Sequence, residues 1–167
     1  MTANIRERMM MKLIPAAALV AGLALAASAN AQIVHINPGK AFISRAVTVP
    51  AGSDLIYVSG ITPQAADKAK PTELGDTKAQ TVSILTQIEG ILKDQGYGLG
   101  DVVMMRVYLV GDAAKGGKMD FAGMMEGYNS FFGKLENKPA RVTMQVAGLV
   151  GPTMLAEIEV QAAKAKK

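Results

Sequence analysis

The stretches PARVTMQV, Pro139–Val146, and AEIEVQ, Ala156–Gln161, both alternate polar with apolar residues. Successive side chains of a β-strand point to opposite faces, so each stretch predicts a strand with one apolar and one polar face. Gly151 and Pro152 lie between the two stretches and predict a turn. The polar faces would carry Arg141, Thr143, Gln145, Glu157, Glu159 and Gln161. Such a face either only meets solvent, or its arginine and a glutamate share a pocket.

Length and charge set the broad class of the protein. The chain has 167 residues, of which 50% are hydrophobic, enough for one globular domain with a core. Its formal net charge is +4, and residues 1–31 hold three basic residues against one acidic residue, so the remainder carries +2. Much of that excess sits in the C-terminal Lys164, Lys166 and Lys167, which is typical of a solubilising end. We therefore expect no nucleic-acid partner.

The counts of cysteine and histidine limit which catalytic groups and metal sites the protein can have. The chain has no cysteine, which excludes disulfides, thiol nucleophiles and thiolate metal sites. His35 is its only histidine and lies near the start of the predicted domain, which argues against a Ser-His-Asp triad or a multi-histidine zinc site. We see no Asp-rich loop of the kind that binds calcium or magnesium. Neither a metal nor a cofactor is expected, and catalysis would fall to carboxylates, arginine, hydroxyls or backbone groups.

The first 31 residues have the pattern of a secretory signal peptide. Residues 1–12 are basic, residues 13–27 are an uninterrupted run of small and apolar residues, and Ala29-Asn30-Ala31 fits a cleavage site. The run is shorter than the roughly 20 residues that cross a bilayer, which disfavours an uncleaved anchor. We predict cleavage after Ala31, a mature protein in the periplasm or outside the cell, and no stable membrane span after processing.

The next part of the chain predicts two strands. Residues 43–49 and 55–59 are β-prone and are separated by the turn-forming sequence Pro50-Ala51-Gly52-Ser53-Asp54, so a hairpin is expected. Gly60 then either ends the second strand or lets a ligand approach bare backbone.

Two helices and a strand follow. Asp76 is expected to cap a helix that Gly96 ends, with an apolar stripe made by Ala79, Val82, Leu85, Ile88 and Leu92. Residues 102–110 predict a strand, and residues 111–118 a mobile loop. That loop lacks the spacing of a phosphate-binding motif. Asp120 is expected to cap a second helix whose stripe is Phe121, Met124, Tyr128, Phe131 and Phe132.

This order of elements predicts an α+β domain: a mixed sheet, joined in part by hairpins, with two helices packed on one face. We expect Arg141, Thr143, Glu157 and Glu159 on the uncovered face. A single domain often covers such a face by forming an oligomer.

Several motifs fall in the order and at the spacing of the Rid family, the reactive intermediate imine deaminases also called YjgF. The resemblance covers about residues 40–163, the core of a domain that we place at 32–167. It implies a chorismate-mutase-like fold and a homotrimer with clefts between subunits. The motifs are Gln80-Thr81 with Leu85, Ile88, Leu92 and Gly96, then Gly100-Asp101-Val102-Val103, Asp120-Phe121 with Tyr128 and Phe131-Phe132, Pro139-Ala140-Arg141, and Glu157-Ile158-Glu159. The last two are the specific ones.

The resemblance also implies an activity, the hydrolysis of 2-imino acids to 2-keto acids and ammonia. Arg141 matches the arginine that holds the substrate carboxylate, and Glu157 the glutamate that positions or activates water. A guanidinium grips a carboxylate through two parallel hydrogen bonds, and a well-placed general base contributes about 10²- to 10⁴-fold. Gly60 matches the family's Ser-Gly beside the ligand. Thr143 replaces a common cysteine and keeps a hydrogen-bond donor.

Other positions depart from the family pattern. Ile43, or Phe42 if the register slips by one residue, stands where the family has a pocket tyrosine, and Met125 stands where it has an asparagine. Residues 113–118 resemble an insertion. We therefore expect a more apolar pocket that takes a larger or different ligand.

Three functions remain open from the sequence. The first is an imine or enamine hydrolase with an altered pocket, and the second is a secreted, non-catalytic binding protein for a small carboxylate or keto acid. The third is an RNA-directed or chaperone-like role, which is also ascribed to the family. Dehydratases that supply imino acids work in the cytoplasm and are not expected in the compartment to which a signal peptide directs the protein. This is an argument against the imine hydrolase.

Overall fold

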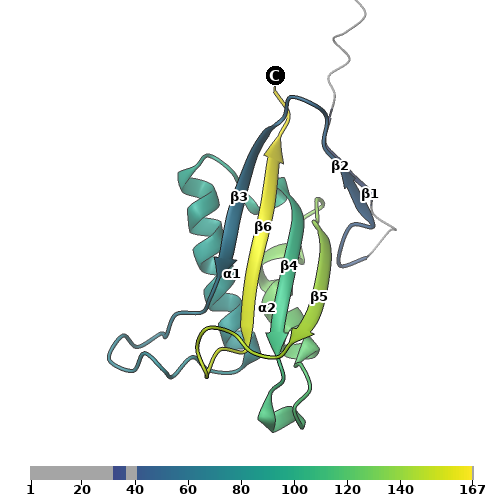
Figure 1. Ribbon diagram of the computed structural model, residues 1–167. Coiled ribbons are helices and arrows are strands. Elements are labelled where there is room, and N and C mark those ends of the chain that lie inside the picture. The colour runs from purple at the N-terminus through teal and green to yellow at the C-terminus, as the bar shows by residue number, and fades with distance from the viewer. Residues whose placement is uncertain (1–31, 37–40, 167) are drawn as a thin grey trace, which may run out of the picture. The chain divides into compact units, whose positions relative to one another are not determined.

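The computed structural model describes residues 32–36 and 41–166, so the predicted signal peptide lies outside the described residues. Four strands form one sheet in the order β3-β6-β4-β5 (Figure 1). Their bounds are β3 Asp54–Ile61, β6 Ala156–Lys164, β4 Val102–Val110 and β5 Ala140–Val146. β6 is antiparallel to both neighbours, whereas β4 and β5 are parallel. The predicted mixed sheet is therefore confirmed.

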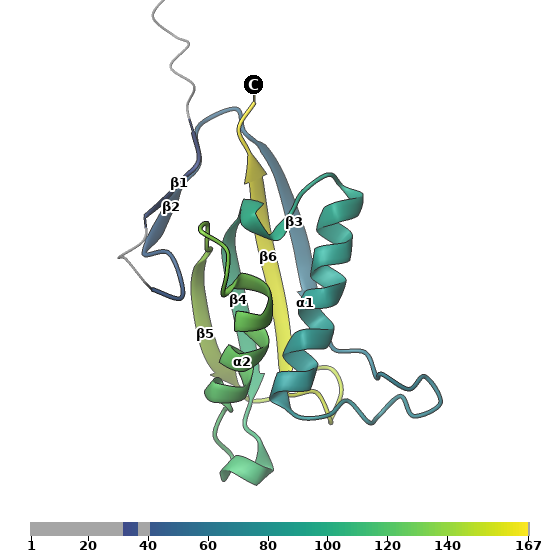
Figure 2. The same cartoon turned by 180° about the vertical axis from the view of Figure 1, so that it is seen from behind.

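Two helices cover one face of this sheet (Figure 2). In this view α1, Thr77–Asp94, lies in front of β3 and β6, and α2, Phe121–Phe132, lies in front of β4 and β5. Short 3-10 turns, η2 Leu99–Asp101 and η3 Ala113–Lys115, precede and follow β4. The α+β class with both helices on one face is confirmed. In the part of the chain that the structure describes, neither helix is long and apolar enough to cross a membrane.

The helix ends follow their capping residues. The Asp76 carboxylate accepts from the backbone N–H of Ala79 at 2.8 Å, and Asp120 accepts from Gly123 at 3.0 Å. Gly96 follows α1 with a φ of 76°, a left-handed conformation that glycine adopts without strain. The buried stripe of α1 is rotated from the predicted one and excludes Ala79 and Val82. Its residues are Thr77, Gln80, Thr81, Ile84, Leu85, Ile88 and Leu92.

The core lies between the sheet and the helices. Met105, Val107 and Leu109 of β4 are fully buried there, and Tyr108 between them points to the other face. Ile158 and Val160 of β6 join them from the neighbouring strand. Neither helix covers the opposite face, which we call the open face.

Strand pairing differs from the two predicted hairpins. β2, Ala46–Thr48, pairs with β1, Val34–Ile36, and not with β3. β5 and β6 are separated by β4. The prediction was wrong because turn residues show where a chain bends but not which strand a segment will meet. β3 instead pairs with the buried β6, which offers more apolar surface than a short edge strand.

Residues 111–118 form a folded turn instead of the loop expected from their composition. The Asp112 N–H donates to the Lys118 carbonyl at 3.0 Å, and the Gly117 N–H donates to the Asp112 carbonyl at 2.9 Å. Gln145 of β5 fastens this turn, since its amide donates to the Gly117 carbonyl and accepts from the Met119 N–H. Side-chain and backbone hydrogen bonds thus anchor the apparent insertion to the end of β5.

Candidate functional site

Arg141 points into the helix layer beneath α2. It is in register with Met105 of β4, whose side chain is fully buried, so the two share the helix-covered face. Its Cζ lies 4.5 Å from the ring centroid of Tyr128 and 5.9 Å from that of Phe121. Its Nη2 donates to Sδ of Met125 at 3.1 Å. One arginine of an edge strand therefore lies against three side chains of α2.

The guanidinium of Arg141 has a buried donor without a partner. Burial lowers the pKa of Arg141, partly offset by Tyr128 beside it. Among the described residues, Nη1 of Arg141 and Oγ1 of Thr143 are buried and have no hydrogen-bond partner. A buried unsatisfied donor is costly, and a carboxylate would satisfy it with a charge-assisted hydrogen bond. A small anion bound beside these two groups would satisfy both of them.

The ring of Tyr128 supports the guanidinium of Arg141 from the α2 side. Its ring stacks on Phe132 with centroids 4.7 Å apart, and its hydroxyl donates to the Phe42 carbonyl at 2.9 Å. Only 1% of the residue is exposed, and burial raises its pKa to about 12 although Arg141 lowers it. Sequence reasoning assigned Tyr128 to the core and missed this contact. The spacing of Phe121, Met125 and Tyr128 at i, i+4 and i+7 was the available signal, because it places them on one helix face.

Phe42 and Ile43 lie beside the start of β5. The Ser44 N–H donates to the Pro139 carbonyl at 2.9 Å, and Ser44 forms a parallel bridge with Ala140. Phe42 is 59% exposed, while Ile43 is half-buried against the core. The hydrogen bond from Tyr128 links this segment to the residue under Arg141.

Glu157 and Gly60 meet on the open face. Glu157 is in register with Tyr108, whose side chain lies opposite to the buried face of β4. A methyl group added to Gly60 would overlap Oε1 of Glu157 and lie 2.9 Å from its Cδ. Only a glycine therefore leaves room for this carboxylate against the backbone of β3.

Glu159 has a structural partner. Its Oε1 accepts from Nη1 of Arg106 at 2.7 Å and from the Tyr108 hydroxyl at 3.3 Å. Arg106 and Tyr108 are on the neighbouring strand β4, so these contacts run across the open face. Glu159 is thus tied to β4, which gives this carboxylate a structural role.

The predicted residues fall into two groups on opposite faces of the sheet. Arg141 and Thr143 lie under α2 together with Met125, whereas Glu157 and Gly60 lie on the open face. The expectation that Arg141, Thr143, Glu157 and Glu159 share the open face was wrong for the first two. Alternation shows which residues of a strand share a face, but not which face the helices cover. Within one chain the arginine and the glutamate cannot touch the same small ligand.

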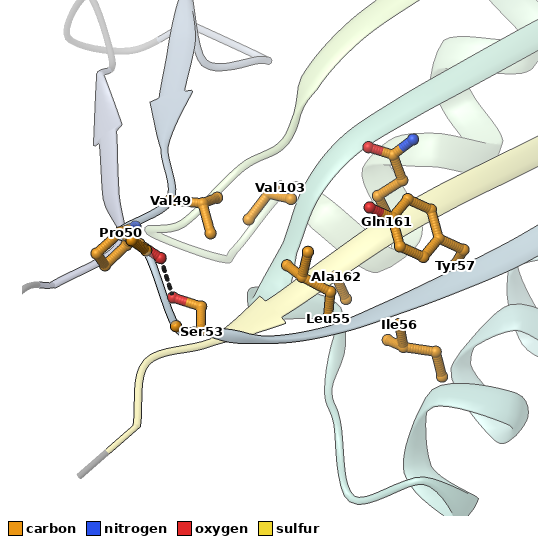
Figure 3. A pocket seen from close by; sticks show the side chains of 11 residues that line it. Val49, Pro50, Ser53, Leu55, Ile56, Tyr57, Val103, Gln161 and Ala162 are labelled. Carbon is orange, nitrogen blue, oxygen red and sulfur yellow. Dashed lines mark hydrogen bonds between the residues drawn. The ribbon is translucent and has the colours of Figure 1, made fainter.

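A separate hollow of about 390 Å³ lies at the start of β3 (Figure 3). It is bounded by the turn at Pro50, where the Ser53 hydroxyl donates to the Pro50 carbonyl at 2.8 Å, and by Tyr57 and Gln161. None of the predicted site residues lines it, and its lining contains no charged side chain. It offers no cation to pair with a carboxylate.

Metal-binding side chains do not gather in the described ranges 32–36 and 41–166. No group of three or more histidine, aspartate or glutamate residues is placed to hold an ion there.

Comparison with known proteins assigns the family. The family model described as endoribonuclease L-PSP matches residues 32–164. The chain belongs to this family, also known as Rid or YjgF. A RutC family protein of Pyrococcus horikoshii is 38% identical to this Rid protein over 119 residues, 70% of this chain and 83% of the relative. The 3-aminoacrylate deaminase RutC of Acinetobacter baylyi is 36% identical over 112 residues, 66% of this chain and 81% of the relative.

Solved structures of Rid proteins have the same fold. A Rid family protein of unknown function from Yersinia pestis superposes with a TM-score of 0.63 at 25% identity, covering 80% of this chain and 100% of that one. TdcF of E. coli, solved with bound serine, gives a TM-score of 0.55 at 28% identity, covering 70% of this chain and 84% of that one.

Proposed function

We propose that this Rid protein hydrolyses small 2-imino acids to 2-keto acids and ammonia in clefts between the subunits of a homotrimer. The observation that carries the proposal is Arg141, a half-buried cation under the aromatic rings of α2 with one buried donor unsatisfied among the described residues. Such a group is suited to a small carboxylate, because the ligand replaces the lost hydration of the cation.

The relatives support a ligand that carries both nitrogen and a carboxylate. One is described as a 3-aminoacrylate deaminase, and another was solved with bound serine. Both small molecules carry these two groups. A 2-imino acid carries them too, with the reactive carbon next to the carboxylate that Arg141 would hold.

The reaction needs few groups. The oxygen of a water molecule adds to the imine carbon while Glu157 accepts a proton from that water. The tetrahedral product then collapses: nitrogen takes up both protons of the water, one returned by Glu157 and one from the new hydroxyl group, the carbon–nitrogen bond breaks, and ammonia leaves as the keto group forms. Arg141 fixes the position of the imine carbon, and Glu157 orients the water. The Thr143 hydroxyl, unsatisfied among the described residues, offers one more hydrogen bond to the substrate.

The opposed positions of Arg141 and Glu157 support the homotrimer. Within one chain these side chains point to different faces of the sheet, so a cleft containing both needs a second subunit. A ring of head-to-tail contacts supplies such clefts, because each subunit offers its Arg141 side to one neighbour and its Glu157 side to the other.

We also propose that the mature protein acts in the periplasm or outside the cell, after cleavage behind Ala31. The basic start, the apolar run and the small residues at positions 29 and 31 support this placement.

The proposed activity is tested with freshly generated 2-iminopropanoate and 2-iminobutanoate. The purified protein should accelerate release of the keto acid, and Arg141→Ala should abolish this acceleration. Glu157→Gln should lower turnover by about 10²-fold or more while binding changes little. Size-exclusion chromatography of each variant serves as the control for intact assemblies.

The same samples distinguish the imine hydrolase from the binding protein and from the RNA-directed role. A melting temperature that 2-keto acids raise in the wild type but not in Arg141→Ala, without acceleration of either imine, would indicate a binding protein. Binding of RNA that weakens as salt rises would support the third function.

A further inference from the structure

We propose that the site around Arg141, formed with Met125, Phe121 and Thr143, selects 2-imino acids with an apolar side chain, and that Met125 sets this preference. The inference rests on the proposed function, because it specifies which acids would enter the same site.

The first argument is the chemistry of the groups around the guanidinium. Arg141 contacts the thioether of Met125 and the rings of Phe121 and Tyr128. The Tyr128 hydroxyl donates its hydrogen bond to the Phe42 carbonyl and is not available to a ligand. Thr143 on the same strand face contributes one hydroxyl. Beyond the carboxylate, a ligand would meet carbon and sulfur atoms on the α2 side of the pocket.

The second argument is the weak contact of Met125 itself. Its sulfur accepts from Nη2 at 3.1 Å, and a thioether is a poor acceptor. A substrate carboxylate is a far stronger acceptor and would take over this donor together with Nη1. Met125 has three rotatable side-chain bonds, so the displaced thioether can pack against the substituent of the bound acid.

The third argument concerns which substituents such a wall rejects. A polar group that enters an apolar wall loses its hydration and gains no hydrogen bond, whereas a branched alkyl group gains packing. One methylene in a hydrophobic pocket changes kcat/KM by about 10- to 200-fold. The preference should therefore be visible in a pair of substrates with equal shape and different polarity.

The imines of leucine and asparagine are such a pair, because their side chains have nearly the same shape. We would measure kcat/KM for both imines, generated in place by a broad amino-acid oxidase with catalase, and Kd for the matching keto acids 4-methyl-2-oxopentanoate and 2-oxosuccinamate. The wild type should favour the leucine-derived compound by about tenfold or more in both measurements.

Two substitutions of the same residue provide the matched comparison. Met125→Asn should reduce the preference to within about threefold, because its amide can pair with the polar substituent. Met125→Leu keeps an apolar side chain of similar size and should retain the preference. A change in folding or assembly alone would alter both substrates alike and leave their ratio unchanged.

The outcomes distinguish the inference from the proposed function. If the protein turns over or binds both compounds equally, or if Met125→Asn leaves the ratio unchanged, the inference is overturned while the imine hydrolase stands. If neither imine is accelerated but keto-acid binding keeps the apolar preference, the hydrolase falls and the selectivity stands. If intact wild-type protein neither binds nor turns over any of these compounds, both are overturned.

Discussion

Tyr128 combines a structural and an electrostatic task. The same ring packs on Phe132, lies under the Arg141 guanidinium and fixes Phe42 through its hydroxyl. Because 1% of it is exposed, it cannot reach a ligand directly. Its role is to hold the guanidinium of Arg141 against α2.

The pKa of Tyr128 predicts how stability depends on alkaline pH. Burial raises it to about 12 in the folded protein, above the ordinary 10.0 that the unfolded chain should show. The unfolded state therefore releases this proton first, and stability falls as pH rises from about 10 to about 12. In Tyr128→Phe this part of the decline, up to roughly 2–3 kcal/mol, should be absent. Urea unfolding at stepwise pH measures it, and equal slopes for the two proteins would contradict the assignment.

Gly60 predicts a separation of binding from chemistry. A methyl group in Gly60→Ala would displace the Glu157 carboxylate, whereas Arg141 lies on the other face and is untouched. Turnover of 2-iminopropanoate should fall by about 10²-fold, while the Kd of a 2-keto acid changes only a few-fold. Gly90→Ala is the control, because an added Cβ there meets nothing within 4 Å. Unchanged turnover in Gly60→Ala would argue against a role for Glu157.

At the scale of single residues, the sequence showed that Arg141 and Thr143 share a face of their strand, and the strand register agrees. It could not show that α2 covers that face. Val142 and Met144 suit a core as well as they suit an interface, and Met144 is 39% exposed on the open face. Which way an edge strand turns depends on the helix above it, and this is a long-range property.

Among the elements, α1 is tied to the loop before β6 by one buried amide. Gln80 is fully buried, its Nε2 donates to the carbonyls of Gly75 and Thr153, and its Oε1 accepts from the Leu155 N–H at 2.7 Å. This loop leads directly to Glu157. The amide therefore sets where β6 begins.

Gln80→Leu should remove the part-buried hydrogen bonds that the Gln80 amide makes to three backbone groups. Each lost bond costs about 1–3 kcal/mol, and partial relaxation of the loop would limit the total loss to about 2–4 kcal/mol. Chemical unfolding of the purified protein measures this loss. Gln87→Leu, which removes the half-buried bond to the Thr62 carbonyl, should cost about 1 kcal/mol. A loss in Gln80→Leu no larger than in this control would contradict the anchoring role.

The starts of both helices and the end of α1 could be predicted because capping aspartates and Gly96 are local signals. The pairing of the strands could not be predicted. A period of two indicates a strand but carries no information on its neighbour, and β4 separates two strands that follow each other in sequence. The rotation of the α1 stripe was missed because buried Gln80 and Thr81 are polar residues. Gln80 donates to the distant Thr153 carbonyl, and Thr81 donates to the Thr77 carbonyl one helical turn earlier.

For the whole molecule, the division of Arg141 and Glu157 between two faces predicts complementation between subunits. Arg141→Ala and Glu157→Gln should each be inactive as pure assemblies. When the two variants are unfolded together and reassembled in equal amounts, about a quarter of the clefts should receive an intact arginine from one subunit and an intact glutamate from its neighbour. Imine hydrolysis should then return to about that fraction of the wild-type rate.

As the control, the two variants are refolded separately and then mixed under conditions in which they do not exchange subunits. This mixture should stay inactive. No recovery in mixed assemblies of the correct size would show that both residues do not serve one shared cleft. The homotrimer itself stays a prediction, which sedimentation of the wild type checks directly.

The position of β6 between β3 and β4 determines when the protein can fold. Asp54 pairs with Lys164, so the last strand of the domain completes the pairing of one of the first. Before the ribosome has released residues 156–164, β3 has no neighbour in the sheet, and β4 can pair only with β5. A nascent chain therefore cannot complete this sheet until residues 156–164 have left the ribosome, so the pairing of β3 waits for the synthesis of a segment about 100 residues later in the chain.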